Sequence, residues 1–139
     1  MAPNIGSRAT SADVAREYFR RFEEGDMDGA LELLDPDCDV DEPPSLPWGG
    51  QRRGGEGVVA LVSDANEHCQ LSIDGLQISD AGAFAVISMT VSFTSHETGR
   101  RVTMPVVELY HVHDGQIRHI DVYYKDTQVI NDLLTRSGL

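Results

Sequence analysis

Long hydrophobic runs are missing from this chain of 139 residues, and so is any apolar signal core near its start, which reads MAPNIGSRATSAD. A membrane span requires roughly 18 consecutive apolar residues, and no segment approaches that length. A secretory leader also requires an apolar core. We therefore expect no membrane contact, and a cytoplasmic location is the default expectation.

Cysteine is scarce, because Cys38 and Cys69 are the only two. Their separation is unlike metal-ligand spacing, and a reducing compartment would keep both as thiols, so we expect two small buried side chains. The sequence also lacks a Ser-His-Asp set, a phosphate loop and a dinucleotide fingerprint. His111 and His113 lie two apart without an evident carboxylate partner. We expect no metal and no cofactor.

Basic residues are few. Lys and Arg number 11 against 23 Asp and Glu, which gives a formal net charge of −12. Nucleic acids and anionic lipids both require a positive surface, so we expect neither as a partner. With these two classes excluded, we expect the ligand to be small or neutral.

The first half of the chain has helical spacing. Residues 1–10 are expected to form a loose tail before one single domain, 11–139. Thr10 or Ser11 can cap a helix that ends at Gly25, a second helix is predicted in MDGALELLD, and a third runs from about Glu56 to His68. Between the last two, CDVDEP is predicted to be extended, and PPSLPWGGQRRGG to be an ordered loop that carries Leu46 and Trp48.

After residue 68 the hydrophobic residues no longer have helical spacing but recur at every second position, as in a strand. Strands are predicted near 70–79, 83–96, 100–113 and 116–124, joined by the turn sequences DAG, ETG and DG, and DTQVINDLLTRSG is predicted to be a closing helix. Helices followed by an antiparallel meander predict an α+β fold with helices on one face of a curved sheet.

The last predicted hairpin, VELYHVHDGQIRHIDVYY, carries acids where sheet is expected. A two-residue DG turn pairs His113 with Gln116, and this count places Glu108 opposite Asp121. Tyr110, His119 and Tyr123 then share their side of the sheet, whereas His111 and His113 face the other way.

The preceding hairpin indicates which side is buried. A turn at Thr98-Gly99 places Met89 opposite Glu108, on the more apolar face of strand 83–96. Two opposed carboxylates there would share a proton and serve as general acid and base. The alternatives are a structural network in which Arg52 or Arg53 neutralises one carboxylate, or a slip of one residue, which would move every side chain across the sheet.

Two segments resemble a known superfamily. The run YFRRFEEGDMDGALELLDPDCDVDEP and the hairpin above resemble nuclear-transport-factor-2-like proteins, and within them the SnoaL-like polyketide cyclases and ketosteroid isomerases, over about residues 12–134. The resemblance implies a cystatin-like fold, in which a cone-shaped, curved antiparallel sheet wraps around N-terminal helices.

The resemblance also implies roles. Tyr18 falls where the isomerases have an oxyanion-hole tyrosine, and Glu42 where they have a proton-shuttling carboxylate. Glu108 matches their protonated oxyanion-hole acid if the hairpin is shortened by one residue. The run RHID resembles the cyclases' EHWD, whose aspartate is their proposed acid/base, and Asp121 matches it. Limonene-type epoxide hydrolases have an arginine where this chain has Val106.

These observations predict a cofactor-independent acid/base isomerase or cyclase that acts on a small apolar carbonyl compound, polyketide-like or steroid-like, in an enclosed pocket. The expected catalytic residues are Asp121, Glu108, Glu42, Tyr18 and His119, and the expected substrate-binding residues are Trp48, Leu46, Phe22, Met89, Tyr110 and Tyr123.

Other interpretations stay open. Tyr18 and Trp48 could be packing residues, and Glu42 a solvated strand end. A non-catalytic small-molecule-binding module and an epoxide hydrolase are the alternative functions, because a fold does not decide a function. We also expect a homodimer through the outer sheet face, where the predicted register places Val107, Leu109, Ile120 and Val122.

Overall fold

The computed structural model describes residues 9–135, so most of the predicted tail and the end of the predicted closing helix lie outside the described residues. The elements in chain order are α1 (Ser11–Glu23), α2 (Met27–Leu31), β1 (Leu34–Glu42), β2 (Gly50–Arg53), α3 (Gly54–His68), β3 (Cys69–Asp80), β4 (Phe84–Ser95), β5 (Arg101–His113), β6 (Gln116–Tyr124) and α4 (Thr127–Leu134).

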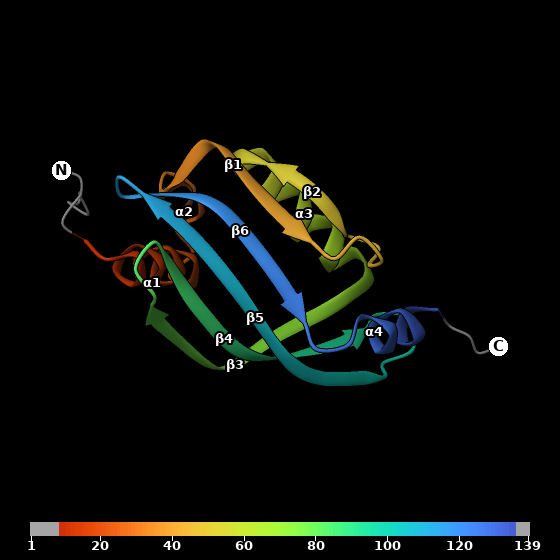
Figure 1. The fold of residues 1–139 in the computed structure, drawn as a ribbon. Helices are drawn as coiled ribbons and strands as arrows, with labels where there is room; N and C mark the ends of the chain where they lie inside the picture. The colour runs from red at the N-terminus through yellow and green to blue at the C-terminus, as the bar shows by residue number, and fades with distance from the viewer. Residues whose placement is uncertain (1–8, 136–139) are drawn as a thin grey trace.

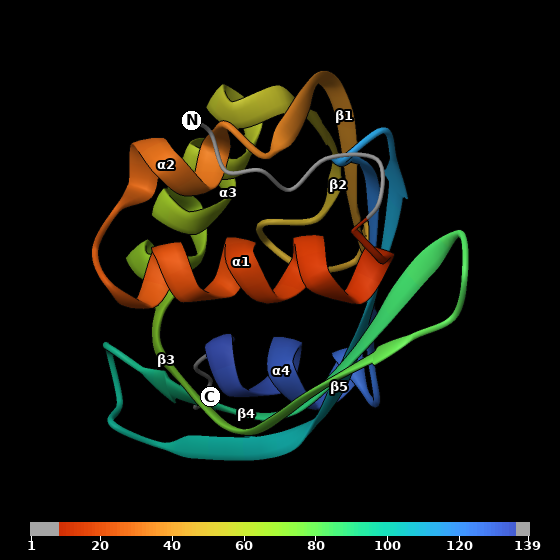
Figure 2. The same ribbon diagram turned by 90° about the vertical axis from the view of Figure 1, so that its left-hand side faces the viewer.

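The six strands form one curved, unclosed sheet in the order β2-β1-β6-β5-β4-β3 (Figure 1). Its concave side wraps around the helices, and α1 runs across the hollow while α3 covers one end (Figure 2). This arrangement confirms the predicted α+β architecture. The pairs are antiparallel except that β1 runs parallel to β6, which the predicted meander did not include.

The helix starts follow local sequence. Thr10 caps α1 by accepting a hydrogen bond from the Asp13 amide, while the Asp13 side chain accepts one from the Thr10 amide. The second helix is shorter than predicted, because Leu34 already belongs to β1 and the Leu33 carbonyl accepts a hydrogen bond from the Ile117 amide. Pairing with a distant strand overrides helical spacing there.

The turns set the sheet register. Asp114 and Gly115 both have positive φ, of 54° and 77°, as the predicted two-residue DG turn requires. The β4–β5 connection is longer than predicted, since Thr94 pairs with Arg101, and Ile87 rather than Met89 lies opposite Glu108. A shift of two residues keeps every side chain on its predicted face.

Two simpler predictions can also be compared with the structure. Cys38 and Cys69 are buried and free, as expected of small packing residues. Among the described residues, every helix is too short or too polar to cross a bilayer.

Candidate functional site

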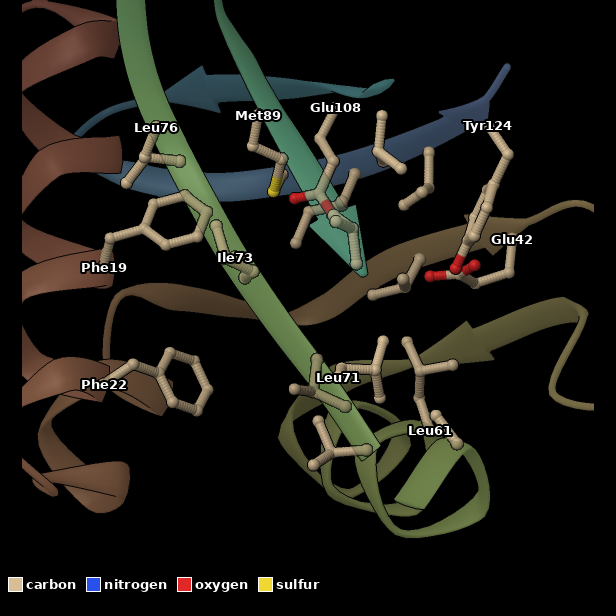
Figure 3. A pocket seen from close by; sticks show the side chains of 18 of the residues that line it. Phe19, Phe22, Glu42, Leu61, Leu71, Ile73, Leu76, Met89, Glu108 and Tyr124 are labelled. Carbon is tan, nitrogen blue, oxygen red and sulfur yellow. The ribbon is translucent and has the colours of Figure 1, made fainter. Parts of the chain in front are cut away.

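A deep cavity lies between the concave face of the sheet and helices α1 and α3 (Figure 3). Its volume is about 720 Å³, within the usual size range of small-molecule sites. Most of the wall is apolar and comes from the alternate positions of the strands that face inward. The side chains that form it include Phe19, Phe22, Val40, Val58, Leu61, Leu71, Met89, Val91, Phe93, Val106, Ile120 and Val122.

Glu108 projects into this apolar space from the middle of β5. The Tyr110 hydroxyl, two residues along the same face, donates a hydrogen bond of 2.9 Å to Glu108 Oε1. Burial raises the pKa of Glu108 to about 7, although the Tyr110 hydrogen bond opposes that rise. Glu108 is therefore a carboxyl that can hold or release its proton near neutral pH.

Tyr18 reaches the cavity from α1, where it is buried and packs edge-on against Tyr110 at a centroid distance of 5.6 Å. Burial, followed by the negative charge of Glu108, raises its pKa well above the usual tyrosine range. The Tyr18 hydroxyl therefore keeps its proton and remains a hydrogen-bond donor.

Glu42, the last residue of β1, also lines the cavity and is only 7% exposed. Its Oε1 atom is buried and finds no hydrogen-bond partner among the described residues. Burial, and then the charge of Glu108, raises the pKa of Glu42 to about 8. The polar groups of Tyr124 and Trp48 and the charge of Arg52 oppose that rise. A buried polar atom without a partner is costly unless a ligand meets it.

Tyr124 is a site residue that the sequence analysis missed. It lines the cavity at the end of β6, and its hydroxyl accepts a hydrogen bond of 3.0 Å from the Trp48 indole nitrogen. Figure 3 shows its hydroxyl beside the Glu42 carboxyl. The alternation of Ile120, Val122 and Tyr124 is the sequence signal that identifies this inward face.

Several predicted site residues come together. Tyr18, Glu42 and Glu108 share the cavity, and the predicted binding residues Phe22, Trp48, Met89 and Tyr110 line it. Leu46 is buried in the core without lining the cavity.

The predicted opposition of Glu108 and Asp121 is wrong. The register follows the DG turn through Val112–Ile117 and then shifts, so that His111 pairs with His119 and Arg118 is left as a β-bulge residue. Glu108 consequently lies opposite Val122. The bulge reverses the faces of the rest of β6: Asp121, His119 and Tyr123 point outward, while Ile120 and Val122, predicted for the outer dimer face, line the cavity.

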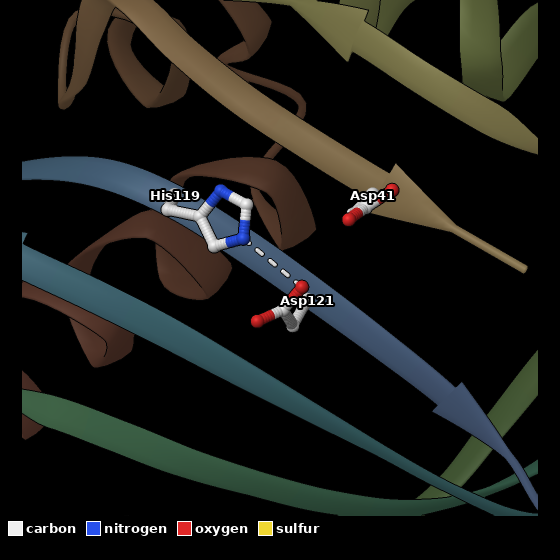
Figure 4. A group of neighbouring side chains, drawn as sticks. All are labelled: Asp41, His119 and Asp121. Atoms are coloured by element: carbon white, nitrogen blue, oxygen red, sulfur yellow. Dashed lines mark hydrogen bonds and ion pairs between the residues drawn. The ribbon is translucent and has the colours of Figure 1, made fainter.

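On the outer face, His119, Asp121 and Asp41 form a partly exposed polar cluster (Figure 4). His119 Nε2 lies 3.0 Å from Asp121 Oδ1, and His111 Nε2 lies 3.8 Å from Asp121 Oδ2. Asp41, on the adjacent strand, pairs with Asp121. Asp121 and Tyr123 also line a smaller outer hollow of about 350 Å³.

Metal-ligand spacing occurs in one group within residues 9–135, namely Asp41, His119 and Asp121, whose ligand atoms lie within 4.8 Å of one another. All three are partly exposed. The hydrogen bond between His119 and Asp121 accounts for the proximity of that pair without an ion. The spacing by itself therefore does not identify a metal centre.

Comparison with known proteins agrees with this fold. The model of the SnoaL-like domain family matches residues 15–120. A nuclear-transport-factor-2-like protein from Burkholderia xenovorans LB400 is 20% identical, with a TM-score of 0.80 over 91% of this chain and 98% of its own. TerC co-crystallised with polyporic acid is 18% identical, with a TM-score of 0.78 and the same coverages of 91% and 98%.

A third structure is a "putative polyketide cyclase" from Xanthomonas campestris pv. campestris, which is 20% identical, with a TM-score of 0.72 over 88% of this chain and 96% of its own. No curated protein matches the sequence. At these identities the solved structures establish the shared fold.

Proposed function

This chain belongs to the SnoaL-like domain family, and from that premise we propose that it is a cofactor-independent acid/base enzyme that isomerises or cyclises a small, largely apolar carbonyl compound, polyketide-like or steroid-like. The observation that carries the proposal is the placement of two carboxyls, Glu42 and Glu108, in one apolar cavity. Stability alone would favour apolar residues at such positions, so their presence points to a role in chemistry.

The two carboxyls influence each other, because the charge of Glu108 raises the pKa of Glu42. Their pKa values of about 7 and about 8 belong to a coupled pair, which loses its two protons in successive steps. Between those values the pair holds a single proton, mostly on Glu42, whose pKa is the higher, and the form with ionised Glu42 and protonated Glu108 is the minor one. One member can then remove a proton while the other donates one.

In the proposed reaction the ionised carboxyl removes a proton next to the substrate carbonyl, and the developing enolate oxygen receives hydrogen bonds. Glu42 suits the first role in the minor single-proton form, because Tyr124, Trp48 and Arg52 all stabilise its charged form and its Oε1 atom has no partner among the described residues. Protonated Glu108 and the Tyr18 hydroxyl suit the second role, since both reach the cavity and Tyr18 keeps its proton. Return of the proton to a different carbon completes an isomerisation, whereas attack of the enolate carbon on a second carbonyl completes a cyclisation.

The comparisons support a small organic ligand. "Putative polyketide cyclase" structures with this fold come from Xanthomonas campestris and Pseudomonas putida, and TerC was co-crystallised with polyporic acid. We propose the same ligand class here. His119 and Asp121 have no part in the reaction as proposed, because they lie on the outer face of β6.

The proposal can be tested with a β,γ-unsaturated cyclic ketone, whose conversion to the conjugated ketone is followed by ultraviolet absorbance. Glu42→Gln and Glu108→Gln are each expected to lower kcat/KM by about 100-fold to 10,000-fold, the usual range for a general acid or base. Asp41→Asn is the matched control, because Asp41 precedes Glu42 on β1 and points to the outer cluster.

Two results would contradict the proposal. Both glutamine variants could retain full turnover, or none of a panel of enolisable ketones could react even though they bind. Binding is measured by the fluorescence of Trp48, the single tryptophan and a cavity residue. Binding without turnover would identify the alternative, a non-catalytic binding module.

Epoxide opening is the remaining alternative. Val106 occupies the position of the epoxide hydrolases' arginine and forms part of the apolar cavity wall. We therefore expect an epoxide probe to give no diol. Incorporation of oxygen-18 from labelled water into a diol product would favour the hydrolase.

A further inference from the structure

The loop between β1 and β2, residues 43–49, carries Trp48 into the core, where it is 1% exposed. The loop folds back on itself through hydrogen bonds from the Leu46 amide to the Pro43 carbonyl and from the Gly49 amide to the Leu46 carbonyl. A Cβ atom on Gly49 would overlap the Pro43 carbonyl oxygen, so this fold of the loop requires glycine. The loop sequence PPSLPWGG therefore holds the Trp48 indole ring in one position.

The indole has one polar atom, and that atom can only donate. Trp48 Nε1–H donates to the Tyr124 hydroxyl oxygen at 3.0 Å. Tyr124 thereby receives a hydrogen bond on its oxygen, and its own single proton is directed to another acceptor. The Glu42 carboxyl lies beside the Tyr124 hydroxyl (Figure 3), and it is the acceptor we infer for that proton, in agreement with the lowering effect of Tyr124 on the pKa of Glu42.

The ring of Tyr124 is held as firmly as its hydroxyl. Phe93 stacks on Trp48 at a centroid distance of 6.3 Å and contacts the Tyr124 ring at 5.8 Å. Arg52 Nη2 donates to the Trp48 carbonyl at 3.4 Å and pairs with Asp64 at 2.9 Å, which ties the next residues of the chain to α3. The three aromatic rings leave the Tyr124 hydroxyl little freedom to turn away.

We propose that Trp48 and Tyr124 are positioning residues: they orient the Tyr124 proton toward Glu42, hold one carboxyl oxygen, and leave Oε1 free to take the substrate proton. This inference rests on the proposed function for its chemistry, whereas the direction of the Trp48–Tyr124 hydrogen bond and the position of the Tyr124 hydroxyl beside Glu42 stand on geometry. Oε1 is the one buried side-chain polar atom within residues 9–135 that lacks a partner.

The charged and titratable groups that act on Glu42 come from three sides. Glu108 on β5 disfavours its charge, whereas Arg52 on β2 and Tyr124 on β6 favour it. Trp48 also has a direct effect on Glu42, the smallest of these contributions, in addition to its effect through Tyr124. Loss of the Tyr124 hydroxyl should therefore raise the pKa of Glu42.

The test is Tyr124→Phe, which removes a single oxygen and keeps the ring against Phe93. The Glu42 carboxyl is titrated by carbon-13 NMR of the glutamate-labelled protein, with Glu42→Gln to assign the signal. We expect the pKa of Glu42 to rise by about one unit, as for the loss of one hydrogen bond to a buried carboxylate. The rise in kcat/KM that accompanies ionisation of Glu42 should shift to higher pH by the same amount. Tyr123→Phe, on the outer face, is the matched control and should change neither quantity.

The order Trp48, Tyr124, Glu42 in this hydrogen-bond relay is tested with Trp48→Phe. This variant should raise the pKa of Glu42 by less than Tyr124→Phe does, and it should add little in the Tyr124→Phe background, because most of its effect passes through Tyr124. If Trp48→Phe fails to fold, Tyr124→Phe alone decides the question. An unchanged Glu42 titration in Tyr124→Phe would overturn the inference even if the protein is an active enzyme. A shifted titration in a protein without turnover would keep the hydrogen-bond relay and remove only the proposed catalysis.

Discussion

The two faces of β5 and β6 carry similar residues in opposite surroundings. On the inner face, Glu108 sits in an apolar cavity and its carboxyl accepts a hydrogen bond from a tyrosine hydroxyl. On the outer face, Asp121 is partly exposed between His111 and His119. The inner carboxyl has its pKa raised to about 7 by burial. Surroundings rather than residue type make one acid a candidate for catalysis and the other a surface charge.

The bulge at Arg118 separates the two faces, because a bulge-free β6 would pair Arg118 with His111 and would turn His119 and Asp121 inward and Ile120 outward. Ile120→Asp imitates the inner face of that strand by placing a carboxylate where Ile120 is 4% exposed, and it should have the largest effect on stability. Burial of an unpaired charge together with the loss of a core side chain costs several kcal/mol. We expect urea denaturation to show a loss of that size in the free energy of unfolding.

Arg118→Ala is the comparison at the bulge itself, because it leaves the residues of both faces in place. It removes the ion pair between Arg118 and Asp35, 3.1 Å apart and half exposed on the arginine side. Such surface pairs contribute about 1 kcal/mol or less. An Ile120→Asp variant that unfolds like Arg118→Ala would show that the inner face of β6 accommodates a charge.

The next largest effect concerns pH. In the folded protein the pKa of Glu108 is about 7, above the ordinary glutamate value of 4.5 that applies when the chain is unfolded. Between these values the folded state binds more protons, so the free energy of unfolding should fall as pH rises through that range. Relative to Glu108→Gln, we expect the wild type to lose about 3 kcal/mol between about pH 5 and about pH 9.

Urea denaturation across that pH range provides the measurement, and Asp121→Asn is the comparison from the outer face. Asp121 is partly exposed, so its replacement should leave the pH dependence of the wild type in place. Parallel pH curves for wild type and Glu108→Gln would show that Glu108 is not dehydrated in the folded protein.

The smallest effect is expected on the outer face itself. Arg53→Ala removes an ion pair with Asp39 of 3.4 Å, in which the arginine side chain is 68% exposed. The change in the free energy of unfolding should be at most about 1 kcal/mol and should shrink at high salt. A larger effect that does not depend on salt would mean that this face is covered in solution, as the predicted homodimer requires.

Much of this molecule follows from local signals in the sequence. The cap at Thr10, the DG turn and the inward residues of β4 were all predicted from turn chemistry and alternation. Tyr18 and Glu42 were found by resemblance and Glu108 also from the alternation of its hairpin, and the structure brings all three to one cavity. Each of these inferences depends on residues that are close in sequence or on a recognisable motif.

The errors arise where distant strands decide the structure. A bulge has no fixed residue signature, and here the only sequence sign is the three-residue step from Ile117 to Ile120 instead of the usual two. The parallel pairing of β1 with β6 is likewise not predictable from a local turn, because no tight turn joins the two strands. Tyr124 was missed for both reasons, since the bulge sets its face and the β1–β6 pairing brings it to Glu42.

The parallel pairing of β1 and β6 also bears on how the protein folds. Asp41 pairs with Asp121, so closing this part of the sheet joins segments 80 positions apart, and such long-range pairing forms slowly compared with local hairpins. Glu42 reaches its dehydrated position only when that closure is made. Completion of the fold near neutral pH should therefore be accompanied by proton uptake, and a late kinetic phase should be faster in mildly acidic buffer, where the carboxyls enter already protonated.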